Sequence, residues 1–315
     1  MGLSFRQFKD RIWFAVDPLT KGIATAPKPV QDVGYALVRA FLWIAYILPG
    51  SPLRGTASDF SCAVMEGPPR RLYRGFVVRF TQALKRMELL RLGRTDEIDS
   101  LLRIPDQARL DALLKDQSGV VLVVPHCHGS VLMVRGLAAR YPTLMLMRGP
   151  AKESRAKTQR PYYAHIGCEL LDVRYSSDLV VARAVIRAMR QGKIVVGIVD
   201  RISKAPPENA PVNKDTDTIR AVAFGQPVGF VGWPARFAEK CNAPILPAMV
   251  EQSPEALTLH IGDAIKTDCQ IKTTQAYVSG LEQFCRQFPM DWGFVYDKQW
   301  ARVLRGSARQ KNNHH

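Results

Sequence analysis

The sequence predicts an α/β fold with a mixed, largely parallel central sheet flanked by helices. Short apolar runs rich in β-branched residues are typical of strands buried on both faces, and here they alternate with segments of helical periodicity. The predicted strands are 120–124, 143–147, 194–199, 245–250 and 256–261. The predicted helices between and after them are 131–139, 179–190, 233–242 and 273–288. This alternation favours a single sheet covered by helices.

The N-terminal part, 1–94, is expected to be helical and to associate with a membrane. Residues 33–50 are apolar except for Arg39, but they are slightly shorter than the ~20 residues that a span needs. A core helix and a helix in or across one leaflet therefore both remain open. Nine Lys or Arg and three acids lie between 54 and 94, and such a basic flank favours anionic lipid. Trp43 and Tyr46 could anchor the helix at the interface.

Two further regions complete the predicted organisation. Residues 95–305 are expected to form the α/β domain, beginning with helical periodicity over 95–116, and 306–315 is expected to be a polar, disordered tail. A helix over 70–92 is predicted to close the N-terminal part.

Composition narrows the classes of partner. The chain carries 44 Lys and Arg against 28 acids, a net charge of +16, so its partner or surface is anionic. No helix-turn-helix, zinc finger or aromatic-basic run is present, so no nucleic-acid partner is expected. The six cysteines have no C-x-x-C spacing, which disfavours a zinc or redox motif, and we expect no cofactor and no metal. The cytoplasmic face of a membrane fits these features best.

Three polar residues fall just past predicted strand ends. His126, Arg148 and Asp200 follow three different strands, and sites in α/β sheets lie at the carboxyl ends of strands. His126 could deprotonate a hydroxyl or amine, because the pKa of histidine lies near neutral pH. The alternative is a histidine whose ring is satisfied by loop carbonyls.

The loop after the first predicted strand contains two further candidates. His128 is a second catalytic candidate, and Cys127 between the two histidines is a candidate nucleophile if they favour its thiolate. A buried, inert thiol is the commoner situation. A zinc site on the two histidines would lack an evident third ligand.

Four ordered blocks resemble the lysophospholipid and lipid A late acyltransferases. The first is the strand that ends at His126, and the second is the strand that ends at Arg148. The third is Gly197–Arg201, a strand that closes on aspartate. The fourth spans Phe224–Pro227, Gly232–Ala238 and Ala243–Pro247, and it is similar to the F-G-x-P, G-x-x-x-x-A and A-P-I-x-P run of these enzymes. The layout is most similar to the lauroyl and myristoyl transferase group.

This resemblance implies a function and a location. It implies an acyltransferase at the cytoplasmic face of the bacterial inner membrane, acting in lipopolysaccharide biosynthesis. The donor would be an acyl carrier protein or acyl-CoA thioester, and the acceptor a lipid A-like lipid. Substrate-binding positions implied in this way are Arg148, Arg201, Phe224, Gly225 and Gly232.

One departure affects the implied mechanism. The family motif is H-x-x-x-x-D/E, in which the acid orients the histidine. The fifth residue after His126 is Val131, the fifth after His128 is Met133, and no acid occurs between His126 and Glu153. Asp200 could replace the missing acid, or it could only pair with Arg201 or cap a turn. A carboxylate within about 3.2 Å of a ring nitrogen would restore the dyad.

Three hypotheses follow from this departure. The protein transfers a fatty acyl group with His126 as general base, or it transfers an aminoacyl group such as glycyl on the same fold. In the third hypothesis it is a catalytically inactive binder of lipid or carrier protein. Fold alone does not choose among them.

Overall fold

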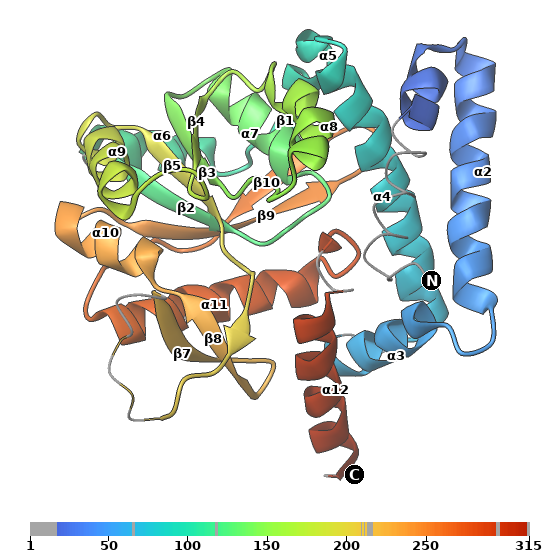
Figure 1. Cartoon of the computed structure of the whole chain (residues 1–315). Helices are drawn as coiled ribbons and strands as arrows, with labels where there is room; N and C mark the ends of the chain where they lie inside the picture. The colour runs from blue at the N-terminus through green and yellow to red at the C-terminus, as the bar shows by residue number, and fades with distance from the viewer. Residues whose placement is uncertain are drawn as a thin grey trace.

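A computed structural model describes residues 18–64, 67–116, 119–208, 210, 212, 217–293 and 297–313. Its centre is a seven-stranded sheet in the order β1-β10-β9-β2-β5-β3-β4 (Figure 1). The strands are β1 (Leu102–Arg103), β2 (Val120–Val124), β3 (Thr143–Met147), β4 (Glu169–Asp172), β5 (Ile194–Ile198), β9 (Ile245–Gln252) and β10 (Leu257–Ile261). The predicted α/β class with a mixed, largely parallel sheet is confirmed.

The middle of the sheet is parallel. β2 pairs in parallel with β5 and β9, and β3 pairs in parallel with β5 and β4. β10 runs antiparallel to β9 and pairs in parallel with β1 at the edge. All five residues of β2 are buried, as expected for β-branched side chains in a strand covered on both faces. The strands predicted from these runs occur with boundaries within two residues of the expected ones.

Helices cover both faces of the sheet (Figure 1). One layer contains α4 (Pro69–Arg91), α5 (Thr95–Asp99), α7 (Ser130–Ala138) and α8 (Glu153–Tyr163); α4 contacts β9, while α7 contacts β3 and β10. The other layer contains α9 (Asp178–Arg190), α10 (Trp233–Cys241) and α11 (Gln270–Gln287), which contact β5, β2 and β9 respectively. The helical periodicity over 95–116 is split, because β1 separates α5 from α6 (Gln107–Asp116).

A second, smaller sheet was not predicted. It contains β6 (Ser203–Lys204), β7 (Thr218–Ala223) and β8 (Gln226–Val231) in the antiparallel order β6-β8-β7. A two-residue turn joins β7 to β8, and both Phe224 and Gly225 have positive φ, at 51° and 72°. Positive φ at both central positions is the geometry that suits a tight hairpin, and glycine adopts it without strain.

The N-terminal helices form a bundle beside the sheet layers. Residues 18–25 are helical, followed by α2 (Lys28–Ile47), α3 (Pro52–Val64) and α4. The Tyr73 hydroxyl of α4 donates to the Leu42 carbonyl of α2 at 2.7 Å, and Tyr46 stacks on Tyr73. Among the described residues, α2 alone is long and apolar enough to cross a membrane, a test that core helices and signal sequences also pass. Residues 1–17 of the predicted membrane-associating region lie outside the description.

The C-terminal segment differs from its prediction. Lys298–Asn313 forms α12, which packs against α3 (Figure 1). Ser307 and Ala308 are buried in this contact. The expectation of a disordered tail over 306–315 does not match the helix that the structure describes as far as Asn313, in which Arg309 and Gln310 are exposed beside the buried pair.

Candidate active site

The register of the two central strands brings His126 and Asp200 together. Val124 of β2 lies opposite Ile198 of β5 in the parallel ladder. His126 lies two residues after Val124, and Asp200 lies two residues after Ile198. Both segments therefore leave the sheet at the same edge. Side chains at equal distances past paired strand ends are neighbours, so two blocks 74 residues apart meet here.

These two side chains form a dyad. The Nδ1 atom of His126 is hydrogen-bonded to Oδ1 of Asp200. The Asp200 side chain is 2% exposed, whereas the His126 side chain is 35% exposed. The carboxylate that the H-x-x-x-x-D/E spacing lacks thus comes from the neighbouring strand. With the proton on Nδ1, the lone pair of the ring lies on Nε2, which is the arrangement of a general base oriented by a carboxylate.

Two tryptophans that the sequence did not single out hold Asp200. Nε1 of Trp292 donates to Oδ2 of Asp200 at 2.7 Å, and Nε1 of Trp300 donates to the Asp200 carbonyl at 2.7 Å. The two indoles pack edge to face at 4.8 Å, and Phe224 stacks on Trp292 at 5.8 Å. A buried carboxylate needs such donors because burial without hydrogen bonds is costly. Asp200 therefore has donors on both carboxylate oxygens.

The segment 291–293 also fixes the backbone of the histidine loop. The Gly293 amide donates to the His126 carbonyl at 2.6 Å, and the His128 amide donates to the Asp291 carbonyl at 3.1 Å. A Cβ on Gly293 would lie 3.0 Å from the His126 oxygen and 3.1 Å from Nδ1 of His128. A side chain at this position would therefore require the histidine loop to move by a few tenths of an ångström.

His128, the second catalytic candidate, lies in a different environment. Its ring packs edge to face against Phe76 at 4.8 Å and Phe80 at 5.7 Å. Its Nε2 is buried and has no hydrogen-bond partner among the described residues. Burial lowers the pKa of His128 to about 4, so the ring is neutral at physiological pH. The structure does not bring His128 together with the dyad.

Cys127, the candidate nucleophile, points into the core. Its Sγ lies 3.3 Å from Sδ of Met249. Burial raises the pKa of the Cys127 thiol well above its usual range, which disfavours the thiolate that a nucleophile requires. The described residues contain no group of three or more His, Cys, Asp or Glu arranged to hold a metal.

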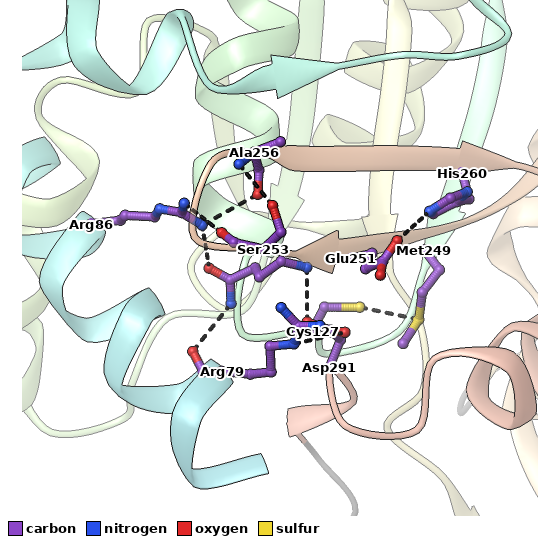
Figure 2. Close-up of polar contacts among 10 residues, drawn as sticks. Arg79, Arg86, Cys127, Met249, Glu251, Ser253, Ala256, His260 and Asp291 are labelled. Carbon is purple, nitrogen blue, oxygen red and sulfur yellow. Dashed lines mark hydrogen bonds and ion pairs between the residues drawn. The ribbon is translucent and has the colours of Figure 1, made fainter. Parts of the chain in front are cut away.

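A buried polar cluster supports the 291–293 segment from the side of α4 (Figure 2). Oδ1 of Asp291 accepts from the Gln252 amide at 2.9 Å, and Oδ2 lies 3.7 Å from Nε of Arg79. Arg86 Nη2 donates to the Ser253 carbonyl at 2.7 Å, which ties α4 to the β9–β10 turn. Burial raises the pKa of Asp291 to about 7. Sequence spacing gave no signal for this cluster, because its members come from three distant segments.

The five implied substrate-binding positions separate into two sets. Arg148 and Arg201 are exposed just past β3 and β5, on the edge that carries His126. Phe224 is 3% exposed and packs behind the dyad, beside Gly225 in the β7–β8 turn. Gly232 precedes α10, where a Cβ would lie 2.6 Å from the Ile219 side chain. The two arginines are therefore exposed near His126, whereas the other three positions shape the fold.

Comparison with known proteins adds no assignment. No family model matches the chain, and no curated protein matches it. The likeness to the late acyltransferases rests on the motifs of the sequence.

Proposed function

We propose that the protein is a membrane-associated acyltransferase in which His126 is the general base. The observation that carries this proposal is the hydrogen bond between a partly exposed histidine and a buried carboxylate at the carboxyl edge of the parallel strands. A carboxylate that holds Nδ1 in this way directs Nε2 of the ring toward an acceptor proton. The resemblance of the four sequence blocks to the late acyltransferases favours acyl transfer as the reaction.

The mechanism follows from the orientation of the ring. Nε2 of His126 removes the proton from an acceptor hydroxyl or amine, and the acceptor atom attacks the carbonyl carbon of a thioester. The carbon–sulfur bond then breaks, and the sulfur leaves as a thiol with the proton from the imidazolium. Asp200 stabilises that imidazolium. Backbone N–H groups at the start of α7 near Gly129, or Arg148, stabilise the oxyanion.

The proposed donor is an acyl carrier protein or acyl-CoA thioester, and the proposed acceptor is a lipid A-like lipid at the cytoplasmic face of the inner membrane. Exposed Arg148 and Arg201 would contact the anionic groups of either substrate. The aminoacyl alternative uses the same base with a different thioester. The hydrogen bond between His126 and Asp200 favours an active transferase over the inactive-binder alternative, which assumed that the histidine has no acidic partner.

The decisive experiment measures thioester turnover by the full chain with lipid acceptors. His126→Ala should lower turnover at least 1,000-fold, roughly the effect of losing a general base from a dyad. His165→Ala, at an exposed histidine away from the dyad, is the matched control. Normal turnover in His126→Ala would remove the proposed base. Mass spectrometry of the product distinguishes a fatty acyl from an aminoacyl addition.

A further inference from the structure

A groove between α2 and α4 concentrates positive charge on the N-terminal bundle. Its volume is about 740 Å³. Arg39 of α2 and Arg70, Arg71 and Arg74 of α4 line it, above an apolar wall that includes Trp43. Within the part of the chain that the structure describes, none of the four arginines forms an ion pair or hydrogen bond. Four unneutralised guanidinium groups around one groove favour an anionic ligand.

The arginines suit a phosphate group in particular. The guanidinium of Arg70 lies 5.3 Å from the centre of the Trp43 ring, so a cation–π contact fixes its position at the groove. Guanidinium forks match the oxygens of phosphate in bidentate geometry. All four arginines are exposed, so a ligand can reach them from solvent.

An exposed apolar stripe adjoins this groove on α2. Its members recur every three or four residues, the spacing of one helix face. They are Val30, Val33, Leu37, Phe41 and Ile44, followed by Leu48 at the C-cap, each at least 53% exposed. Ala40, which lines the groove, lies three residues after Leu37 and four before Ile44, so the stripe borders the groove. In Figure 1, α2 lies on the outside of α4, away from the sheet.

We propose that the groove between α2 and α4 binds the phosphate headgroup of an anionic lipid, with the lipid acyl chains along the α2 stripe. The proposal rests on the membrane location in the proposed function, but not on acyl transfer. Charge complementarity selects the phosphate, and the adjoining apolar stripe selects a lipid over a soluble anion. An acidic carrier protein would match the arginines but would leave the stripe exposed.

Co-sedimentation of the full chain with vesicles tests the proposal. The probes are phosphatidylcholine vesicles and vesicles that also contain phosphatidylglycerol, which should bind more tightly. Replacing Arg39, Arg70 and Arg74 together by Gln should weaken binding to the anionic vesicles roughly 100-fold. The matched control replaces Arg183, Arg190 and Lys240, exposed on α9 and α10, by Gln and should bind nearly as well as the wild type. Equal losses in both triple variants would overturn the proposal in favour of net charge alone.

Two further variants separate a headgroup site from diffuse attraction. The Arg39→Lys, Arg70→Lys, Arg74→Lys variant keeps the charge but loses the guanidinium forks, so it should bind at least 3-fold more weakly. Full binding by this variant would overturn a phosphate site. Leu37→Ser with Phe41→Ser should also weaken vesicle binding at least 10-fold. Because every substituted side chain is exposed, far-ultraviolet circular dichroism should confirm an intact fold.

Competition identifies the source of the phosphate. Soluble glycerol phosphate should not displace the vesicles, and complete displacement would show a site for a soluble phosphate. Saturable binding of an acidic acyl carrier protein to the groove, without vesicle binding, would also overturn the proposal. These measurements use no acyl donor. Vesicle binding without turnover therefore leaves this inference intact and removes the proposed function, and the converse result does the opposite.

Discussion

His126 and His128 lie two residues apart, yet the protein gives them opposite environments. His126 faces Asp200 and is partly exposed at the sheet edge, whereas the ring of His128 packs edge to face against Phe76 and Phe80 of α4. Two histidines in one loop therefore need not belong to the same catalytic site. The residues that arrive from other strands and helices decide which histidine can act as a base.

Among the variants considered, removing the carboxylate that pairs with His126 should have the largest effect on thioester turnover. Asp200→Asn keeps the shape but can donate to Nδ1 and so favours the wrong tautomer, which places the proton on Nε2. We expect thioester turnover to fall roughly 1,000-fold, as in dyads whose acid is neutralised. Steady-state kinetics should show the loss mainly in kcat. Asp263→Asn, at an exposed carboxylate paired with Arg109, should retain activity, and a comparable loss there would contradict the assignment.

Variants of His128 and of Asp291, whose backbone contacts it, should change the pH dependence of stability rather than the activity. The pKa of Asp291 is raised to about 7, so between about pH 4 and pH 7 the folded state holds a proton that the unfolded state has lost. Stability from this group therefore falls as pH rises through that window. The pKa of His128 is lowered to about 4, so between about pH 4 and pH 6.5 the unfolded state holds the extra proton. Stability from His128 therefore rises with pH.

Asp291 and His128 change the free energy of unfolding with pH in opposite directions, and single variants should reveal each contribution separately. Asp291→Asn should make the free energy of unfolding rise more steeply from about pH 4 to pH 6.5, and His128→Leu should make it fall. The change is at most about 1.4 kcal/mol per pH unit for one proton. Urea unfolding across this range measures it. Identical pH profiles in the two variants would show that the groups do not titrate as the burial implies.

A smaller effect is expected from the tryptophans behind Asp200. Trp292→Phe keeps an aromatic ring against Phe224 but removes the donor to Oδ2, while Trp300→Phe removes only the donor to the backbone oxygen. A lost hydrogen bond to a charged group costs about 1.5–3 kcal/mol of stability. We expect roughly tenfold lower kcat/KM in Trp292→Phe, with a shifted acidic limb of the pH–rate profile. Trp300→Phe should leave that limb in place, and a shift in both variants would indicate a general packing effect.

The dyad could be anticipated from sequence because it depends on strand order and register alone. Buried apolar runs mark the ends of β2 and β5 in the sequence, so Asp200 is a candidate for the missing acid from its position just past a strand end. Trp292 lies after α11 and Trp300 lies in α12, and no local pattern in the sequence specifies that either indole reaches Asp200. The β7–β8 hairpin and the amphipathic α12 were not predicted either, since tertiary contacts stabilise them.

Cys127 provides the smallest expected effect and the sharpest distinction between two mechanisms. Its Sγ contacts Met249 on the buried side of the loop, and burial raises the pKa of the thiol. Cys127→Ala should therefore retain turnover within about threefold, while loss of the sulfur costs roughly 1 kcal/mol of stability. Intact-protein mass spectrometry after mixing with donor should show no acyl adduct on the wild type. An adduct that disappears in Cys127→Ala would replace the direct attack by a covalent intermediate and move the chemistry from His126 alone to the adjacent thiol.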